Sequence, residues 1–383
     1  MTSELHGYLQ ALLQNLRKAR EKANVTPEQL EERLILGPGW IRQFEAGDSV
    51  PSLGLLIAIL HETGTGLPDL LRGLPEPEAA AFERYIFAEQ SGPNIIVHFR
   101  YARYDAQYTL QNAQADQFDT VIRVLRDGLA RLAAVKEGQS EAIKSDSVAR
   151  AFLAAVQAWP RANPSDLWWF VINRAYCDPF NHPAQNARLD LAQSWKRTGG
   201  WALEEVLVRH YAPFLKRNHI NLYIANGAEK QRLVRALRLN DRVEADKIDV
   251  VLTGDTLDGP RFFGVVHVKA SFAERRTDDV PMSIALTRGG FTSPLWTMDC
   301  KSTPSTHPEN HGELGSVEGR RSAKRKDIED EGYFTACFSY NLNTQPSQGG
   351  LPPERRVHIC NFSDPADAFS RFIIGRWQAF PKS

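Results

Sequence analysis

An aspartate and a lysine stand at the ends of two neighbouring apolar runs. Asp249 precedes the run 250–252, and Lys269 follows the run 262–268. Glycine, aspartate and proline between the runs predict two adjacent strands joined by a short hairpin loop. The carboxylate and the ammonium group would then lie side by side at one end of a sheet. Because a carboxylate can hold a hard cation such as Mg²⁺ and an ammonium can position water, the pair suits metal-assisted phosphodiester hydrolysis.

A second acid precedes these strands. The segment 197–205 reads Arg-Thr-Gly-Gly-Trp-Ala-Leu-Glu-Glu and opens a run with helical spacing of its apolar residues, namely Leu203, Val206, Leu207, Tyr211 and Leu215. The spacing predicts that Glu204 lies in the first turns of a helix. Carboxylates also suit a first helical turn because of the helix dipole, so a structural role for Glu204 stays open.

The order of these elements carries a resemblance. Glu204, Asp249 and the run Lys-Ala-Ser-Phe-Ala-Glu-Arg-Arg at 269–276 resemble the PD-(D/E)xK nuclease superfamily, and within it the type II restriction endonucleases related to EcoRII and the CCGG cutters such as BsaWI. The resemblance implies an α/β (α+β) core with a mixed central sheet. It also implies Mg²⁺-dependent cleavage of double-stranded DNA at a CCGG-like palindrome, leaving 5′-phosphate and 3′-hydroxyl ends. Asp249, Glu204 and the carbonyl of Val268 would hold the metal, and Lys269 would orient the attacking water.

One position departs from the family pattern. His267 stands where most relatives have an acid, and imidazole is a poor ligand for Mg²⁺. The EcoRII-like enzymes take an acid from the following helix, but the matching region here contains Met282 and Ser283. The acids within reach are Glu274, Asp278 and Asp279. We take Glu274 and Asp279 as candidates for the additional acid.

A rival site lies further along the chain. Asp299 and Lys301 have the acid-x-lysine spacing, and Glu313 follows. Two residues that are two apart on a strand face the same side, so this pair can also form a site. Pro294 and Pro304 leave room for only a short strand there. We therefore favour Lys269 over Lys301.

A basic run at 320–327 is a candidate for base recognition. The run resembles the Arg/Lys-Asp cluster of CCGG cutters, and this resemblance implies that Arg325, Lys326 and Asp327 read bases. Arginine and lysine donate to guanine O6 and N7, and aspartate accepts from cytosine N4. The alternative is a solvated turn, which is the usual location of such a run.

The segment 9–71 resembles a helix-turn-helix domain of the Cro/XRE type. Thr26, Pro27 and Gln29 form a helix start with a cap, a proline at the first position and a capping partner. Arg42 and Gln43 are candidates for DNA contact. We expect the neighbouring Glu31 and Glu32 to face DNA phosphates unfavourably, so DNA reading and a structural or dimerising role both stay open.

The chain divides into three predicted parts. They are a helix-turn-helix domain at 1–74, a helical region at 75–192 and an endonuclease core at 193–383. Within the helical region, we expect helices near 83–89, 118–132 and 148–158, and a strand at 94–97. Strands near 336–340 and 357–362 and a last helix from about 364 complete the core.

Composition narrows the class of protein. The 383 residues contain 46 Lys+Arg and 46 Asp+Glu, so a nucleic-acid site has to arise from local charge. Four widely separated cysteines, no signal peptide and no long apolar run predict a prokaryotic cytoplasmic protein with no membrane partner. The expected partners are double-stranded DNA, a second copy in a homodimer and a cognate DNA methyltransferase. A non-catalytic DNA-binding regulator with a degenerate nuclease core is the alternative, and a DNA-repair nuclease is a third possibility.

Overall fold

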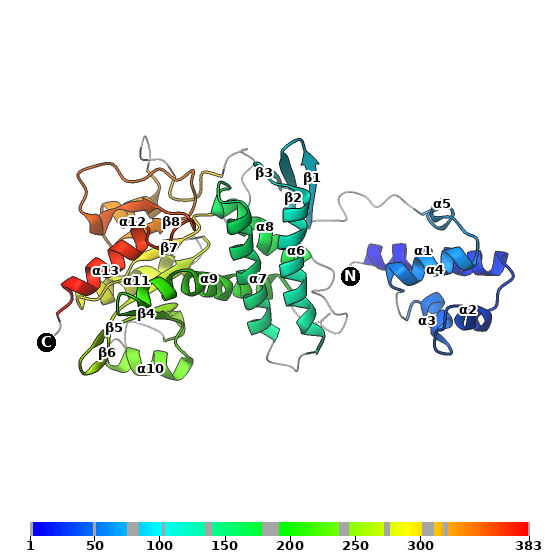
Figure 1. The fold of residues 1–383 in the computed structure, drawn as a ribbon, viewed down its shortest axis with the longest axis horizontal. Helices are drawn as coiled ribbons and strands as arrows, with labels where there is room; N and C mark the ends of the chain where they lie inside the picture. The colour runs from blue at the N-terminus through cyan, green and yellow to red at the C-terminus, as the bar shows by residue number, and fades with distance from the viewer. Residues whose placement is uncertain are drawn as a thin grey trace. The chain divides into compact units, whose positions relative to one another are not determined.

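The computed structural model describes most of the chain and divides it into two compact units. The described residues are 3–48, 51–74, 84–101, 104–134, 140–177, 191–236, 245–271, 276–300, 310–315, 317 and 321–381. One unit comprises Met1–Glu83 and the other Arg84–Ser383 (Figure 1). We describe each unit by itself. Within these ranges, none of the helices has the length and apolar character that crossing a bilayer requires.

The N-terminal unit is a small all-helical domain. Its helices are α1 Ser3–Lys22, α2 Pro27–Arg33, α3 Trp40–Ala46, α4 Leu53–Glu62 and α5 Leu67–Leu70. Helix α2 begins as predicted, with Thr26 as the cap and a reciprocal hydrogen bond to Gln29. A buried ion pair of 2.6 Å between Arg20 and Glu45 joins α1 to α3. The domain therefore combines an apolar core with one internal charge pair.

The second unit opens with a three-stranded antiparallel sheet. Its strands are β1 Arg84–Ser91, β2 Asn94–Tyr101 and β3 Tyr104–Leu110. The helix predicted near 83–89 is wrong, whereas the strand at 94–97 is confirmed within β2. Ile86 and Ala88 pack against the core while Phe87 is exposed, so this segment follows the two-residue period of a strand.

Long helices connect this sheet to the rest of the unit. They are α6 Ala115–Ala130, α7 Ser140–Ala158, α8 Pro164–Cys177 and α9 Leu191–Lys216. The helices predicted near 118–132 and 148–158 correspond to α6 and α7. Gly128 lets α6 approach α7, because a Cβ at this position would lie 2.5 Å from Ser147 Oγ. Phe152, Trp168 and Leu207 share one apolar core with the strands that follow.

A mixed six-stranded sheet forms the centre of the second unit. Its strands are β4 Ile220–Tyr223, β5 Val250–Thr256, β6 Gly259–Lys269, β7 Leu295–Thr297, β8 Cys337–Ser339 and β9 Val357–Ile359. They lie in the order β4-β5-β6-β7-β8-β9, antiparallel from β4 to β6 and parallel from β6 to β9. The predicted hairpin and the two late strands are confirmed as β5–β6, β8 and β9.

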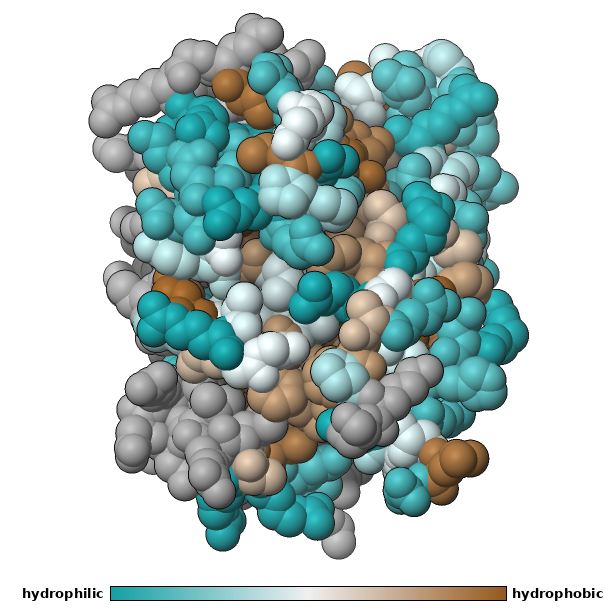
Figure 2. Space-filling model, turned by 90° about the vertical axis from the view of Figure 1, so that its left-hand side faces the viewer, coloured by the Kyte–Doolittle hydropathy of each residue, from teal (hydrophilic) through white to brown (hydrophobic). Residues whose placement is uncertain are grey.

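Helices cover both faces of this sheet. Besides α9, the helices of this part of the chain are α10 Gly227–Ala236, α11 Arg276–Arg288, α12 Ala323–Glu329 and α13 Ala368–Ala379. Val250 and Leu252 pack with residues of α9 and α13, whereas Val251 packs with residues of α10 and α11. Figure 2 shows that hydrophilic residues cover most of one end of this unit, with apolar residues gathered mainly towards its middle and a few elsewhere. The alternation along β5 thus matches a strand that is buried on both faces.

Candidate active site

Three charged side chains meet where β5 begins and β6 ends. Asp249 directly precedes β5, Lys269 is the last residue of β6, and Asp279 lies in the first turns of α11. Antiparallel pairing of Val250 with Val266 brings Asp249 to the end of β6. All three side chains are buried. Charged groups are rarely buried unless they are paired, so this cluster is a functional-site candidate.

The cluster is held by short polar contacts. Asp249 Oδ2 accepts hydrogen bonds from Lys269 Nζ at 2.7 Å and from the Val268 amide at 2.8 Å. Lys269 Nζ also lies 3.4 Å from Asp279 Oδ1. Burial disfavours the charged form of Asp279, but the neighbouring His267 and Lys269 outweigh it and hold the pKa of this carboxyl below its usual value. Two carboxylates therefore share one ammonium group.

His267 belongs to the same cluster. His267 and Lys269 are two residues apart on β6, so they lie on the same face of the strand. Ligand atoms of Asp249, His267 and Asp279 lie within 4.8 Å of one another, which is close enough to hold one metal ion. Ligand chemistry alone predicts that His267 is a poor Mg²⁺ ligand, but the two-residue period of β6 indicates that it lies beside Lys269.

The structure places Glu204 differently from the sequence interpretation. Helix α9 begins at Leu191, so Glu204 lies in its middle, and the prediction that Glu204 lies in the first turns of a helix is wrong. Gly199 lies inside the helix and faces Ile172 and Trp168 of α8. A glycine in a helix costs about 1 kcal/mol relative to alanine, and the packing of α9 against α8 offsets this cost. Glu204 is buried in a helix that contacts β6. It does not belong to the group of ligands that can share one metal ion.

Of the other acid candidates, Asp279 is the one whose side chain the structure describes. Glu274 lies outside the described residues, as does the side chain of Asp278. Met282 and Ser283 follow Asp279 along α11, and Ser283 Oγ lies 2.8 Å from Ser293 Oγ. Asp279 is the candidate that the structure brings into contact with Lys269.

The rival acid Asp299 has a different environment. Strand β7 ends at Thr297, and Asp299 has a φ of 47°, so it does not continue the strand. Its Oδ1 accepts from the amides of Glu313 at 2.7 Å and Leu314 at 3.0 Å, and its Oδ2 accepts from the Thr344 hydroxyl. Burial raises the pKa of Asp299 to about 6. This carboxyl anchors the loop at 312–314, while Lys301 lies outside the described residues.

The candidate base-reading residues separate into interior and surface positions. Arg325 is fully buried and donates to the carbonyls of Leu314, Gly315 and Gln345 and to Glu329. Asp327 is buried as well, whereas Lys326 is exposed. In this conformation Arg325 stabilises loops of its own chain, and Lys326 is the exposed one of the three candidates.

The helix-turn-helix candidates lie on the surface of the N-terminal unit. Arg42 and Gln43 are exposed on α3, and Arg42 forms an ion pair with Glu28. The expectation for Glu31 is wrong, because its buried carboxylate turns inward and accepts from the amides of Gly39 at 3.0 Å and Ile41 at 2.9 Å. The carboxylate of Glu31 therefore caps the N-terminus of α3, where its negative charge also interacts favourably with the helix dipole.

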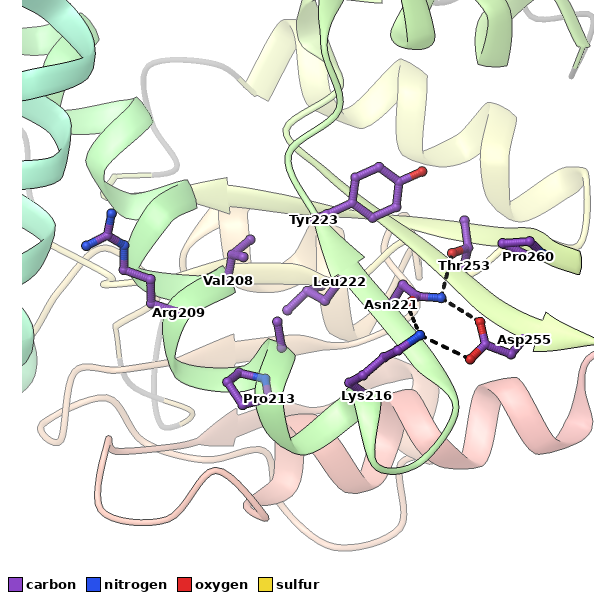
Figure 3. A pocket seen from close by; sticks show the side chains of 11 residues that line it. Val208, Arg209, Pro213, Lys216, Asn221, Leu222, Tyr223, Thr253, Asp255 and Pro260 are labelled. Atoms are coloured by element: carbon purple, nitrogen blue, oxygen red, sulfur yellow. Dashed lines mark hydrogen bonds and ion pairs between the residues drawn. The ribbon is translucent and has the colours of Figure 1, made fainter.

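An open groove lies apart from the charged cluster. It has a volume of about 810 Å³ and runs between the second half of α9 and strands β4 and β5 (Figure 3). At one end, Lys216 Nζ donates to Asn221 at 2.7 Å and to Asp255 at 3.3 Å. Neither Asp249 nor Lys269 lines this groove.

The mixed sheet, with an acid and a lysine at the ends of adjacent strands and a second acid from the next helix, defines a nuclease core of the PD-(D/E)xK class. Residues 11–74 match the model of a helix-turn-helix domain. The chain is 38% identical over 239 residues to the type II restriction enzyme AgeI of Thalassovita gelatinovora, covering 60% of this chain and 84% of that enzyme. The chain therefore belongs to the AgeI family of type II restriction endonucleases, and the prediction of a type II restriction endonuclease is confirmed.

A solved structure agrees with this assignment. The crystal structure of a specific AgeI–DNA complex superposes with a TM-score of 0.60 at 32% identity, over 76% of this chain and 99% of that chain. About a quarter of this chain thus has no counterpart there. A pre-specific BsaWI–DNA complex gives a TM-score of 0.31 at 13% identity, over 68% of this chain and 93% of that chain, and we draw nothing from it.

Proposed function

We propose that the enzyme hydrolyses phosphodiester bonds of double-stranded DNA with Mg²⁺ at the cluster of Asp249, Lys269 and Asp279. The observation that carries this proposal is the sharing of the Lys269 ammonium by two buried carboxylates, with Nζ–O distances of 2.7 and 3.4 Å. Such a cluster provides anionic oxygen ligands and a fixed positive charge within the same few ångströms. Phosphodiester hydrolysis needs both, because charge develops on the attacked phosphate.

The residues of the cluster fit a hard cation. Asp279 Oδ2 is buried and, within the described residues, has no hydrogen-bond partner, so a lone pair is available. Asp249 and Asp279 would hold Mg²⁺ together with the carbonyl of Val268, and oxygen ligands suit this ion. When bound, Mg²⁺ supplies Lewis acidity and lowers the pKa of coordinated water. Glu204 would contribute through a water molecule from α9.

Lys269 has the positioning role. Its ammonium group is fixed by Asp249 and Asp279, so it can orient a water molecule in line with the scissile bond. Attack on phosphorus with departure of the 3′ oxygen leaves 5′-phosphate and 3′-hydroxyl ends. Glu274 remains a second candidate acid by the resemblance.

DNA recognition is assigned to other parts of the chain. We assign base contact at a CCGG-like palindrome to Lys326, with Arg325 and Asp327 as the buried support of that helix. AgeI was solved as a DNA complex, and its similarity to this chain supports DNA as the substrate. A palindrome has two-fold symmetry, so a homodimer would place one cluster on each strand.

The three-part division of the chain describes separate tasks. Residues 193–383 would cut DNA, 75–192 would support the core, and 1–74 would contact flanking DNA through Arg42 and Gln43. Host DNA must be spared by a sequence-specific cutter. A cognate DNA methyltransferase is therefore the expected functional partner in the cytoplasm of a prokaryote.

The proposal is tested with purified full-length protein and unmethylated phage DNA, with Mg²⁺ or with EDTA. We expect discrete Mg²⁺-dependent fragments that are lost in Lys269→Ala. Lys216→Ala is the matched control, since Lys216 also contacts an aspartate but is exposed. Binding of DNA without cleavage under any divalent ion would contradict the proposal. Cleavage by Lys269→Ala at the wild-type rate would remove Lys269 from the mechanism.

A further inference from the structure

The charged cluster contains a nitrogen atom that nothing in the described structure satisfies. The imidazole of His267 is fully buried, and its Nδ1 has no hydrogen-bond partner. It lies 3.6 Å from Asp279 Oδ1, which is too long for a hydrogen bond. Asp279 Oδ2 is unsatisfied as well. Leaving a buried polar atom unsatisfied costs free energy, so a ligand that engages both atoms recovers that cost.

The other ring nitrogen of His267 already has a partner. His267 Nε2 lies 2.9 Å from Ser293 Oγ, which in turn lies 2.8 Å from Ser283 Oγ. Nδ1 is therefore the ring nitrogen that is left to bind a metal ion, and any proton that it carries leaves on binding. In the bound form, Nε2–H donates to Ser293 Oγ, which is the arrangement typical of a metal-bound histidine.

We propose that His267 Nδ1 joins Asp249 and Asp279 in a mixed nitrogen and oxygen site that binds first-row transition metal ions in preference to Mg²⁺. The inference rests on the proposed endonuclease site and specifies its metal class. Ligand atoms of the three residues lie within 4.8 Å of one another. Imidazole favours transition metals, whereas Mg²⁺ prefers oxygen ligands and keeps its waters.

The charge of the cluster does not distinguish between divalent ions. Two carboxylates and the Lys269 ammonium leave a formal charge of −1 near the metal position, which attracts Mg²⁺ and Co²⁺ alike. The preference therefore comes from the nitrogen ligand, which Mg²⁺ uses poorly and Co²⁺ uses well.

The test measures metal binding, independent of cleavage. Untagged full-length protein is titrated with Mg²⁺, Mn²⁺ and Co²⁺ by calorimetry, and the Mn²⁺ complex is measured by electron spin echo envelope modulation. We expect affinity to rise from Mg²⁺ to Mn²⁺ to Co²⁺ and ¹⁴N modulation to be present in the wild type. In His267→Gln, we expect Co²⁺ affinity to fall roughly 10–100-fold, Mg²⁺ affinity to change little and the ¹⁴N signal to vanish.

His210→Gln is the matched control, because His210 is another largely buried imidazole whose Nε2 has no partner in the described residues. We expect this variant to retain the ¹⁴N signal and the affinity order. The ¹⁴N modulation is measured on the wild-type protein itself. The inference can therefore be tested even if His267→Gln does not fold.

Failure of this inference differs from failure of the proposed function. Bound Mn²⁺ without ¹⁴N modulation, equal affinities for Mg²⁺ and Co²⁺, or no metal binding would overturn the inference. Mg²⁺-dependent DNA cleavage would still support the endonuclease in any of these cases. Nitrogen-coordinated Mn²⁺ in a protein that cuts no DNA with any divalent ion would sustain the metal site and overturn the proposed function.

Discussion

Two buried aspartates beside the central sheet differ in what surrounds them. Asp279, on α11, lies beside Lys269 and His267, and its pKa is held below the usual value. Asp299, two residues after β7, is surrounded by amide and hydroxyl donors, and burial raises its pKa to about 6. A nearby cation keeps a buried carboxylate ionised and able to bind a metal, whereas neutral donors alone leave a structural anchor. Burial alone therefore does not distinguish a candidate metal ligand from a structural aspartate.

The largest expected difference between the two aspartates is in DNA cleavage. Asparagine keeps the shape of aspartate and removes the charge. We expect Asp279→Asn to lose at least about 100-fold in cleavage rate, since a metal ligand is lost, while Asp299→Asn stays near the wild type. Initial rates on unmethylated phage DNA with Mg²⁺ measure both. Equal losses in the two variants would remove the distinction.

Removal of the Lys269 ammonium group should make the environment of Asp279 resemble that of Asp299. Lys269→Met leaves Asp249 and Asp279 buried without an ammonium group, which costs roughly 3–5 kcal/mol of unfolding free energy near pH 7.5. In the wild type, the lowered pKa of Asp279 contributes stability that is lost as the pH falls. In the variant, a raised pKa would restore stability as the pH falls. Denaturant unfolding at pH 5 and 7.5 measures this, with exposed Lys216→Met as the control.

The pH dependence of Asp299 has the opposite sign to that of Asp279. A folded-state pKa of about 6, above the usual 3.8, gives stability that is present below pH 3.8 and lost as the pH rises through 6. Asp299→Asn removes this loss, so we expect a gain of up to roughly 3 kcal/mol at pH 7.5. Unfolding from pH 4 to 8 measures it. Some dependence should remain, because burial also raises the pKa of Asp166 to about 6.

The smallest expected effect concerns the loop that Asp299 anchors. Gly312 has a φ of 65°, and a Cβ there would lie 2.3 Å from Asp299 Oδ2. Gly315 has a φ of 66° but has nothing within 4 Å of such a Cβ. We expect both alanine variants to lose about 1–3 kcal/mol through backbone strain, and Gly312→Ala to lose more. Equal melting temperatures would show that the contact with Asp299 is not tight.

Local sequence patterns predicted part of the geometry of the candidate site. Asp249 and Lys269 are separated by one hairpin, so apolar runs and turn residues suffice to place them together. The structure brings them to 2.7 Å. Asp279 could be named only as one of several acids, because its position depends on where α11 begins and how it packs on the sheet. His267 was excluded by ligand chemistry alone, although strand periodicity put it on the face of Lys269.

Long-range contacts account for the predictions that differ from the structure. The basic run around Arg325 predicts an exposed side chain. The structure instead encloses Arg325 between carbonyls of residues that lie 10 and 20 positions away in sequence. Glu31 reads as a surface charge because its partners, Gly39 and Ile41, lie beyond the helix that contains it. The strand β1 was taken for a helix because its pairing partner, β2, rather than its own composition, determines its conformation.

The strand order of the central sheet, β4 to β9, follows the order of the chain. During synthesis, each strand therefore emerges next to a partner that is already present. Asp249 and Lys269 can meet once one hairpin has formed, whereas Asp299 must await Leu314 and Thr344. We expect the pair Asp249 and Lys269 to assemble before the loop anchor, with β5–β6 amides protected from exchange earlier than those near Asp299 during refolding. Simultaneous protection would show that the sheet forms in a single cooperative step.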